Sequence, residues 1–177
     1  SGAPLGILIN TNVEYDEKFM FETVGYNLEG NELGASFGMA QLEKLDQNIA
    51  TRQENFKRQC EFFAQYDQFF STPIESSDFF TAWLAFPILI KEDAPFSRRE
   101  FQIYLEERNI QTRVVFTGNV LRQPMTSNID KRVRDSGYPN ADAVMERGVL
   151  LPLHHGLKEP MFERFFNTVE EFLEKKT

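Results

Sequence analysis

The residues whose types are best suited to bind a ligand lie in the stretch 111–124, QTRVVFTGNVLRQP. An apolar, strand-like run is flanked there by Arg113 and Arg122, and Gly118 and Asn119 follow it. An arginine beside a buried strand often binds a carboxylate or phosphate through two parallel hydrogen bonds. The alternative is that each arginine pairs with an acidic side chain of the same chain, and the residue types favour neither. We interpret this stretch as a strand that ends at a polar pocket.

Other polar groups beside predicted turns are Asn27, Gln123, His154 and His155. The motifs of P-loops, dinucleotide sites, serine hydrolases and zinc proteases are absent from the sequence. The two adjacent histidines are expected to face opposite sides of a strand, so they should not share a metal ion. The single cysteine excludes an internal disulfide and an all-cysteine metal site. We therefore expect no catalytic residue and no metal site within this chain.

The composition narrows the possible partners. The 177 residues carry a formal net charge of −8 and have a pI of about 4.9. An acidic surface of this kind disfavours binding to nucleic acid or to anionic lipid. No run approaches the ~20 apolar residues that a membrane-spanning helix needs. We expect neither a nucleic acid nor a membrane as partner.

The first third of the chain predicts an arm and a long helix. Residues 1–31 show no clear periodicity and predict an irregular arm that packs on another body. From Asn31, a plausible N-cap, apolar residues recur at helical spacing as far as Phe63. This pattern predicts one continuous helix over residues 32–66, about 50 Å long, which would link two bodies. The alternative is a helix packed at the edge of a single domain.

The remainder, residues 67–177, alternates between short strands and helices. Strands are predicted at 69–72, 81–91, 110–117 and 149–153, and helices at 98–108, 141–147 and 161–174. Ser97 and Glu100 have the spacing of a capping box, Asn109 is a typical helix stop, and Pro87 requires a strand edge or a bulge. This order predicts an α+β domain in which helices cover one side of a sheet.

Three segments carry a family resemblance. They are GYN at 25–27 followed by GMAQLEKLD at 38–46, the run APFSRREFQIYLEERNIQTRVVFTGNVLRQP at 94–124, and GVLLPLHHGLKEPMFERFFNTVEEFL at 148–173. They resemble the DegT/DnrJ/EryC1/StrS family of sugar aminotransferases, which are fold-type I enzymes dependent on pyridoxal phosphate (PLP). The GNxxRQP part is most similar to the branch containing the CDP-4-keto-6-deoxyglucose 3-dehydrases.

The resemblance runs from residue 15 to the end of the chain and implies a C-terminal portion of such an enzyme. Residues 1–31 would be an arm from the end of the large domain, and 32–66 the long linking helix. Residues 67–177 would be the small C-terminal α+β domain, with a small, mostly antiparallel sheet covered by helices.

The resemblance also implies roles for individual residues. The cofactor lysine is expected upstream of the GYN motif, so Lys18, Lys44 and Lys57 are not candidates for it. Asn27 is expected to contact the PLP phosphate of the other subunit of a homodimer. The sugar substrate is expected to meet the side chains of Arg113, Asn119 and Arg122. The sequence LEGNE at 28–32 departs from the family pattern, which puts a basic contact there in doubt.

The function implied is that of a cytoplasmic, PLP-dependent nucleotide-sugar aminotransferase of deoxysugar biosynthesis. Its partners would be an amino donor and a nucleotide-linked keto-sugar. The 177-residue chain alone is expected to be inactive and to bind no PLP. Two alternatives stay open: a PLP- or PMP-dependent nucleotide-sugar 3-dehydrase, and a non-catalytic domain for dimerisation or partner binding. A lysine or a histidine at the upstream cofactor position would distinguish the aminotransferase from the dehydrase.

Overall fold

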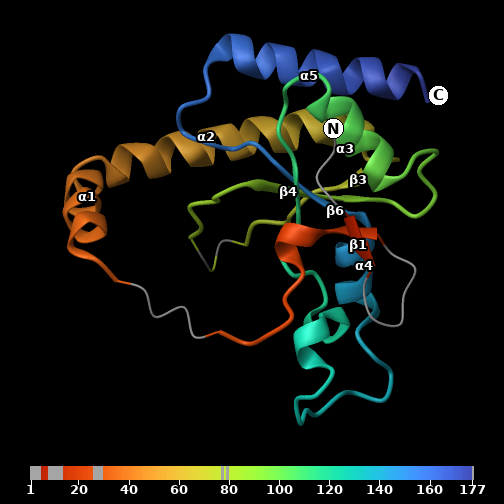
Figure 1. The fold of residues 1–177 in the computed structure, drawn as a ribbon. Coiled ribbons are helices and arrows are strands. Elements are labelled where there is room, and N and C mark those ends of the chain that lie inside the picture. Colours follow the sequence, from red (N-terminus) through yellow and green to blue (C-terminus); the bar gives the residue numbers. More distant parts are fainter. Residues whose placement is uncertain (1–4, 8–13, 26–29, 77, 79, 177) are drawn as a thin grey trace.

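A four-stranded antiparallel sheet lies at the centre of the computed structural model, which describes residues 5–7, 14–25, 30–76, 78 and 80–176 (Figure 1). The strands run in the order β3 (Phe70–Ser71), β4 (Phe86–Ile90), β6 (Gly148–Leu151) and β5 (Arg113–Val114). Phe86 lies opposite Leu151, and Arg113 lies opposite Leu150. The predicted α+β class with a small antiparallel sheet is confirmed.

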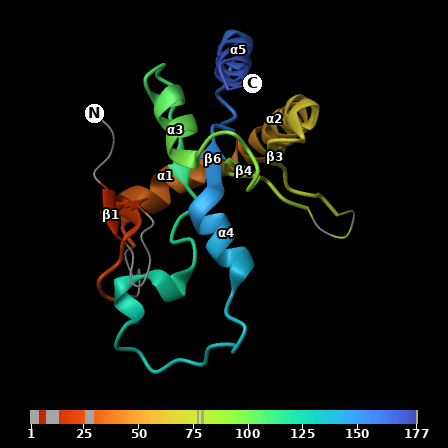
Figure 2. The same ribbon diagram turned by 90° about the vertical axis from the view of Figure 1, so that its right-hand side faces the viewer.

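Three helices lie on one side of this sheet: α2 (Leu45–Phe63), α3 (Arg98–Glu106) and α5 (Glu159–Glu174). Helix α4 (Pro139–Arg147) lies away from them, below the sheet in both views (Figures 1 and 2). Alternate residues of β4 are buried, as expected when one face of a strand packs on a core. The core is rich in phenylalanine, with Phe56, Phe62, Phe63, Phe70, Phe86, Phe96, Phe101, Phe165 and Phe172.

All four strands are shorter than predicted, and the difference is largest for two of them. The stretches 81–91 and 110–117 form strands only at β4 and β5. Pro87 lies opposite Leu150 of β6, whereas the pairing of β3 in the described part of the chain reaches only Leu89 and Ile90. One side of the strand is therefore unpaired at Pro87, as its missing N–H requires.

Helix α3 begins where its sequence predicts and ends at Glu106, two residues earlier than predicted. The Ser97 hydroxyl accepts a hydrogen bond from the Glu100 N–H (3.2 Å), and the Glu100 carboxylate accepts one from the Ser97 N–H (2.9 Å). Asn109 stops the helix in a left-handed conformation, with φ of 57°. Both local predictions are confirmed.

Glu100 makes the stability of the fold depend on acid pH. Hydrogen bonds from Lys176 and Ser97 lower the pKa of this carboxyl from 4.5 to about 2. A depressed folded-state pKa stabilises the fold above the unfolded pKa, and this contribution is lost as the pH falls toward 2. Glu100→Gln retains a side chain that can cap but removes the charge. We expect a shallower loss of stability between about pH 5 and pH 2 in this variant, measured by urea unfolding across that range. Equal slopes in the two proteins would contradict the assignment.

The prediction of one continuous helix over 32–66 is wrong. Helix α1 (Glu32–Leu42) ends before α2 begins, and Lys44 between them has φ −104° and ψ −1°. Helix α1 lies at the far end of α2, away from the sheet (Figure 1). No residue of α1 is buried, so packing within the chain does not hold it in line with α2. The predicted cap at Asn31 is confirmed, because its side chain accepts a hydrogen bond from the Gly34 N–H (2.7 Å).

The N-terminal arm is more regular than predicted. Strand β1 (Leu5–Ile7) pairs antiparallel with β2 (Glu14–Asp16), and one 3-10 turn, η1 (Glu17–Phe19), follows. Tyr15 of β2 is fully buried beside Val114 and Met145. Strands of three residues are too short to show an alternating pattern, which explains why the sequence did not reveal them. The arm thus packs on the same domain, and the division of the chain at residues 31 and 66 stays a prediction.

The apolar side chains of α1 predict self-association of the 177-residue chain. Leu33, Phe37, Met39 and Leu42 are between 66% and 85% exposed. An apolar surface of this kind favours association, so sedimentation velocity should show species larger than a monomer at high concentration. Replacing Phe37 and Leu42 by serine should reduce that association. The matched control Leu84→Ser, at an exposed loop position, should not. A monomer at every concentration would contradict the prediction.

Candidate functional site

The stretch 111–124 leaves the sheet after β5 and turns back on itself. It ends in two 3-10 turns, η3 (Val120–Arg122) and η4 (Pro124–Thr126). Gly118 has φ of 58°, and a Cβ at this position would lie 2.4 Å from the Cγ of Met145. Both facts require glycine there. We call residues 115–124 the substrate loop, because the sequence predicted a substrate-contacting role for this stretch.

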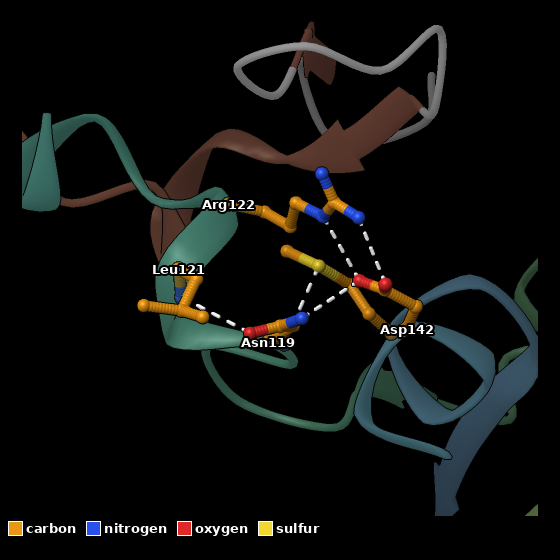
Figure 3. A network of polar contacts seen from close by, with 5 residues as sticks. Asn119, Leu121, Arg122 and Asp142 are labelled. Atoms are coloured by element: carbon orange, nitrogen blue, oxygen red, sulfur yellow. Dashed lines mark hydrogen bonds and ion pairs between the residues drawn. The ribbon is translucent and has the colours of Figure 1, made fainter. Parts of the chain in front are cut away.

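Asn119 and Arg122 of the substrate loop converge on Asp142 of α4 (Figure 3). Arg122 donates from Nε to Oδ1 (2.9 Å) and from Nη2 to Oδ2 (2.8 Å) of the carboxylate. Asn119 is 5% exposed; its Nδ2 donates to Oδ1 of Asp142 (2.7 Å), and its own Oδ1 accepts from the Leu121 N–H (3.1 Å). Arg122 therefore has the acidic partner that the sequence left open as an alternative.

Asp142 is the residue of this network that the sequence interpretation missed. Hydrogen bonds from Arg122 are the main cause that lowers the pKa of its carboxyl, so it is ionised at neutral pH. A signal for it was present, because Asp142 lies in the first turn of a predicted helix, where an acid suits the helix dipole. The sequence could not show which arginine it would meet.

Arg113 stands apart from this network among the described residues. It lies on β5, is partly exposed, and donates from Nη1 to the Thr112 carbonyl (2.8 Å). Of the three predicted substrate-contacting residues, the structure brings Asn119 and Arg122 together and leaves Arg113 on the neighbouring strand.

The N-terminal arm also holds the substrate loop in place, through hydrogen bonds. The buried Gln123 donates from Nε2 to the Thr117 carbonyl (2.9 Å) and accepts from the Phe21 N–H (3.0 Å). The Phe21 carbonyl in turn accepts from the Met125 N–H (2.7 Å). The loop is thus held by α4 on one side and by the arm on the other.

Tyr15 and Arg98 complete the attachment of the arm. The Tyr15 hydroxyl donates to the Phe116 carbonyl (2.7 Å), and Arg98 donates from Nη2 to the Glu14 carbonyl (3.1 Å). The Arg98 guanidinium lies 5.4 Å from the centre of the Tyr15 ring. Burial is the main cause that raises the pKa of Tyr15 to about 12, so its phenol stays protonated and donates throughout the neutral range.

His154 and His155 do not face opposite ways as expected. They follow β6 in a loop, and their ring centres lie 4.1 Å apart. His154 Nδ1 accepts a hydrogen bond from the Gly156 N–H (2.9 Å). The alternation that holds within a strand does not apply beyond its end. Across the described residues, the side chains form no group of three or more potential metal ligands.

The lysines at positions 18, 44 and 57 do not have the surroundings of a PLP-binding lysine. A lysine that binds this cofactor covalently is activated in a desolvated pocket, whereas Lys18, Lys44 and Lys57 are all exposed. Asn27, the predicted phosphate contact, lies outside the described residues. None of the helices described has the length and apolar character to cross a membrane.

The chain is similar to a lipopolysaccharide biosynthesis protein and to a nucleotide-sugar 3-dehydratase. Lipopolysaccharide biosynthesis protein RfbH of Salmonella typhimurium is 30% identical over 158 residues, 89% of this chain and 36% of the relative. The dTDP-4-dehydro-2,6-dideoxy-D-glucose 3-dehydratase of Saccharopolyspora spinosa is 31% identical over 163 residues, 92% of this chain and 35% of the relative. The chain thus spans about a third of the length of these curated relatives.

The fold is shared with solved structures. The E. coli GDP-4-keto-6-deoxy-D-mannose-3-dehydratase with bound hydrated PLP matches with a TM-score of 0.68 and 24% identity, over 87% of this chain and 38% of that protein. The model of the DegT/DnrJ/EryC1/StrS aminotransferase family matches residues 7–170. Since that match covers most of the sequence, the chain belongs to the DegT/DnrJ/EryC1/StrS aminotransferase family.

Proposed function

We propose that the whole protein is a PLP-dependent enzyme that modifies a nucleotide-linked keto-deoxysugar, and that this chain supplies its small domain. The family match over residues 7–170 is the observation that carries this proposal. When bound, PLP supplies an electron sink for bond making and breaking at the sugar carbon. The residues of this chain would bind and orient the sugar.

Two reactions are candidates. Amino transfer to the keto group is supported by the description of the family as aminotransferases. Removal of the C-3 hydroxyl is supported by the relative in Saccharopolyspora spinosa and the E. coli structure, which are both named as 3-dehydratases. The residue at the upstream cofactor position would separate them.

The geometry around the substrate loop suggests a different substrate contact for each of the polar residues. Asn119 and Arg122 both donate hydrogen bonds to Asp142. We propose that these two side chains form the edge of the sugar-binding pocket and contact the sugar there. Arg113 donates from Nη1 to the Thr112 carbonyl, and we propose that its other N–H groups bind an anionic or hydroxyl oxygen of the substrate. We keep Asn27 as the proposed phosphate contact across a homodimer. We further propose a cytoplasmic protein, and a 177-residue chain that is inactive alone.

Product analysis tests the proposal. The whole protein is incubated with PLP, glutamate and dTDP-4-keto-6-deoxyglucose, or its GDP-linked mannose counterpart, and the products are identified by mass spectrometry. An amino sugar would indicate amino transfer, and a 3-deoxy sugar would indicate dehydration. Unchanged substrate in both cases would contradict the enzyme proposal and favour a non-catalytic, partner-binding role.

A further inference from the structure

Phe116, near the start of the substrate loop, has an unusual backbone conformation. Its φ is 44°, in the left-handed region, which a bulky aromatic residue adopts only at a cost in free energy. Burial of the ring does not offset that cost, because Phe116 is 55% exposed. A strained residue with an exposed ring is a candidate for a functional role.

The strained conformation is fixed from several directions. The Phe116 N–H donates to the Val114 carbonyl (2.8 Å), which closes a tight turn. The Phe116 carbonyl accepts from the hydroxyl of Tyr15, which lies 101 positions earlier and is fully buried. The Phe19 ring meets the Phe116 ring edge-on at 6.3 Å. The arm therefore contacts Phe116 through both its carbonyl and its ring, in a conformation in which the ring is 55% exposed.

We propose that the Phe116 ring packs against the C–H face of the sugar in the nucleotide-sugar substrate, and that Tyr15 is the positioning residue that holds the ring there. This inference rests on the function proposed above. The face of an aromatic ring carries partial negative charge and attracts weakly positive C–H groups. A deoxysugar lacks at least one hydroxyl and so presents more C–H surface than a common hexose. The loop thus carries an apolar ring as well as the amide of Asn119 and the guanidinium of Arg122, the mixture of groups that is typical of a small-molecule site.

The first test separates ring loss from backbone strain. Glycine accepts a φ of 44° without strain, so Phe116→Gly in the whole protein should leave the melting temperature unchanged or raise it. The affinity for the probes GDP-fucose or dTDP-rhamnose, which both carry a 6-deoxysugar, should fall about tenfold when measured by isothermal titration calorimetry. Affinity for GDP or dTDP alone should change by less than about twofold, since these lack the sugar.

Two control variants make the comparison sharper. Phe116→Tyr keeps an aromatic ring and should bind the nucleotide-sugar within about twofold of the parent. Asn109→Gly relieves the other non-glycine residue with positive φ among those described, and it should leave sugar affinity unchanged. A purely structural Phe116 would instead lower the melting temperature when replaced by glycine.

A double-mutant cycle tests the role of Tyr15. Tyr15→Phe removes only the hydroxyl and should weaken nucleotide-sugar binding severalfold. In the Phe116→Gly background the same change should weaken it no further, because no ring remains to be positioned. Additive losses would overturn the positioning role.

The inference and the proposed function fail in different ways. If the parent protein binds a nucleotide-sugar and Phe116→Gly binds it equally well, the inference is overturned and the proposed function stands. Equal losses for the nucleotide-sugar and the nucleoside diphosphate would mean that the ring contacts the base, which also overturns the sugar assignment. If the parent binds neither probe, the proposed function fails, and this inference fails with it.

Discussion

Replacing Phe63 by alanine is expected to lower the free energy of unfolding by about 3–5 kcal/mol, the range for deleting a buried phenylalanine side chain. Phe63 is 1% exposed, and its ring meets those of Phe70, Phe86 and Phe165 at centre distances between 5.2 and 6.3 Å. The three neighbouring rings come from β3, β4 and α5, and Phe63 itself is on α2. Removing the Phe63 ring therefore weakens the packing of α2 and α5 against the sheet. Urea unfolding monitored by circular dichroism measures the effect.

The matched control is the same substitution at an exposed position. Phe80 is 69% exposed, and Phe80→Ala should change the free energy of unfolding by no more than about 0.5 kcal/mol. A loss at Phe63 as small as the loss at Phe80 would show that the aromatic cluster is not the core of this domain.

Replacing Asp142 by alanine is expected to cost about 1–3 kcal/mol of stability, because the buried Asn119 amide loses its acceptor. The ion pair itself contributes little, since the side chains of Arg122 and Asp142 are each 35% exposed. Asp142→Asn retains a carbonyl oxygen for Asn119 and should lose less. Unfolding of the three proteins in urea at neutral pH gives the comparison. Identical losses in the two variants would rule out the amide as the cause.

The contribution of Asp142 to the free energy of unfolding should also depend on pH, and it should decrease in acid. The folded-state pKa of this carboxyl is lowered from 3.8, mainly by the hydrogen bonds from Arg122. The stabilisation is therefore complete above about pH 4 and is lost as acid protonates the folded state. The difference between the parent protein and Asp142→Ala should accordingly shrink slightly as the pH falls below 4, by the part that the Arg122 contact contributes, because a protonated carboxyl still accepts from Asn119.

Local features of this fold could be predicted because their causes are local. The capping box at Ser97 and Glu100, the cap at Asn31 and the left-handed stop at Asn109 each depend on residues within a few positions of one another. The same holds for the helices that follow Ser97 and Lys158, whose apolar faces repeat at helical spacing.

Features that depend on distant residues could not be predicted. Asp142 meets Arg122 across 20 positions, and Tyr15 meets Phe116 across 101. Spacing in a sequence does not show which polar groups come together after folding. The break at Lys44 has a related cause, because an amphipathic pattern indicates a helix but not whether a core will hold it straight. The sugar-contacting roles of Arg113, Asn119 and Arg122, and the role of Asn27, stay predictions.

Retention of PLP tests most directly the proposal that this chain contains the small domain of a larger PLP-dependent enzyme. The whole protein and the 177-residue chain are each incubated with PLP and passed through a desalting column, and bound cofactor is measured by its visible absorbance. The account predicts stoichiometric PLP on the whole protein and none on the 177-residue chain. PLP retained by the 177-residue chain alone, or by neither protein, would contradict it.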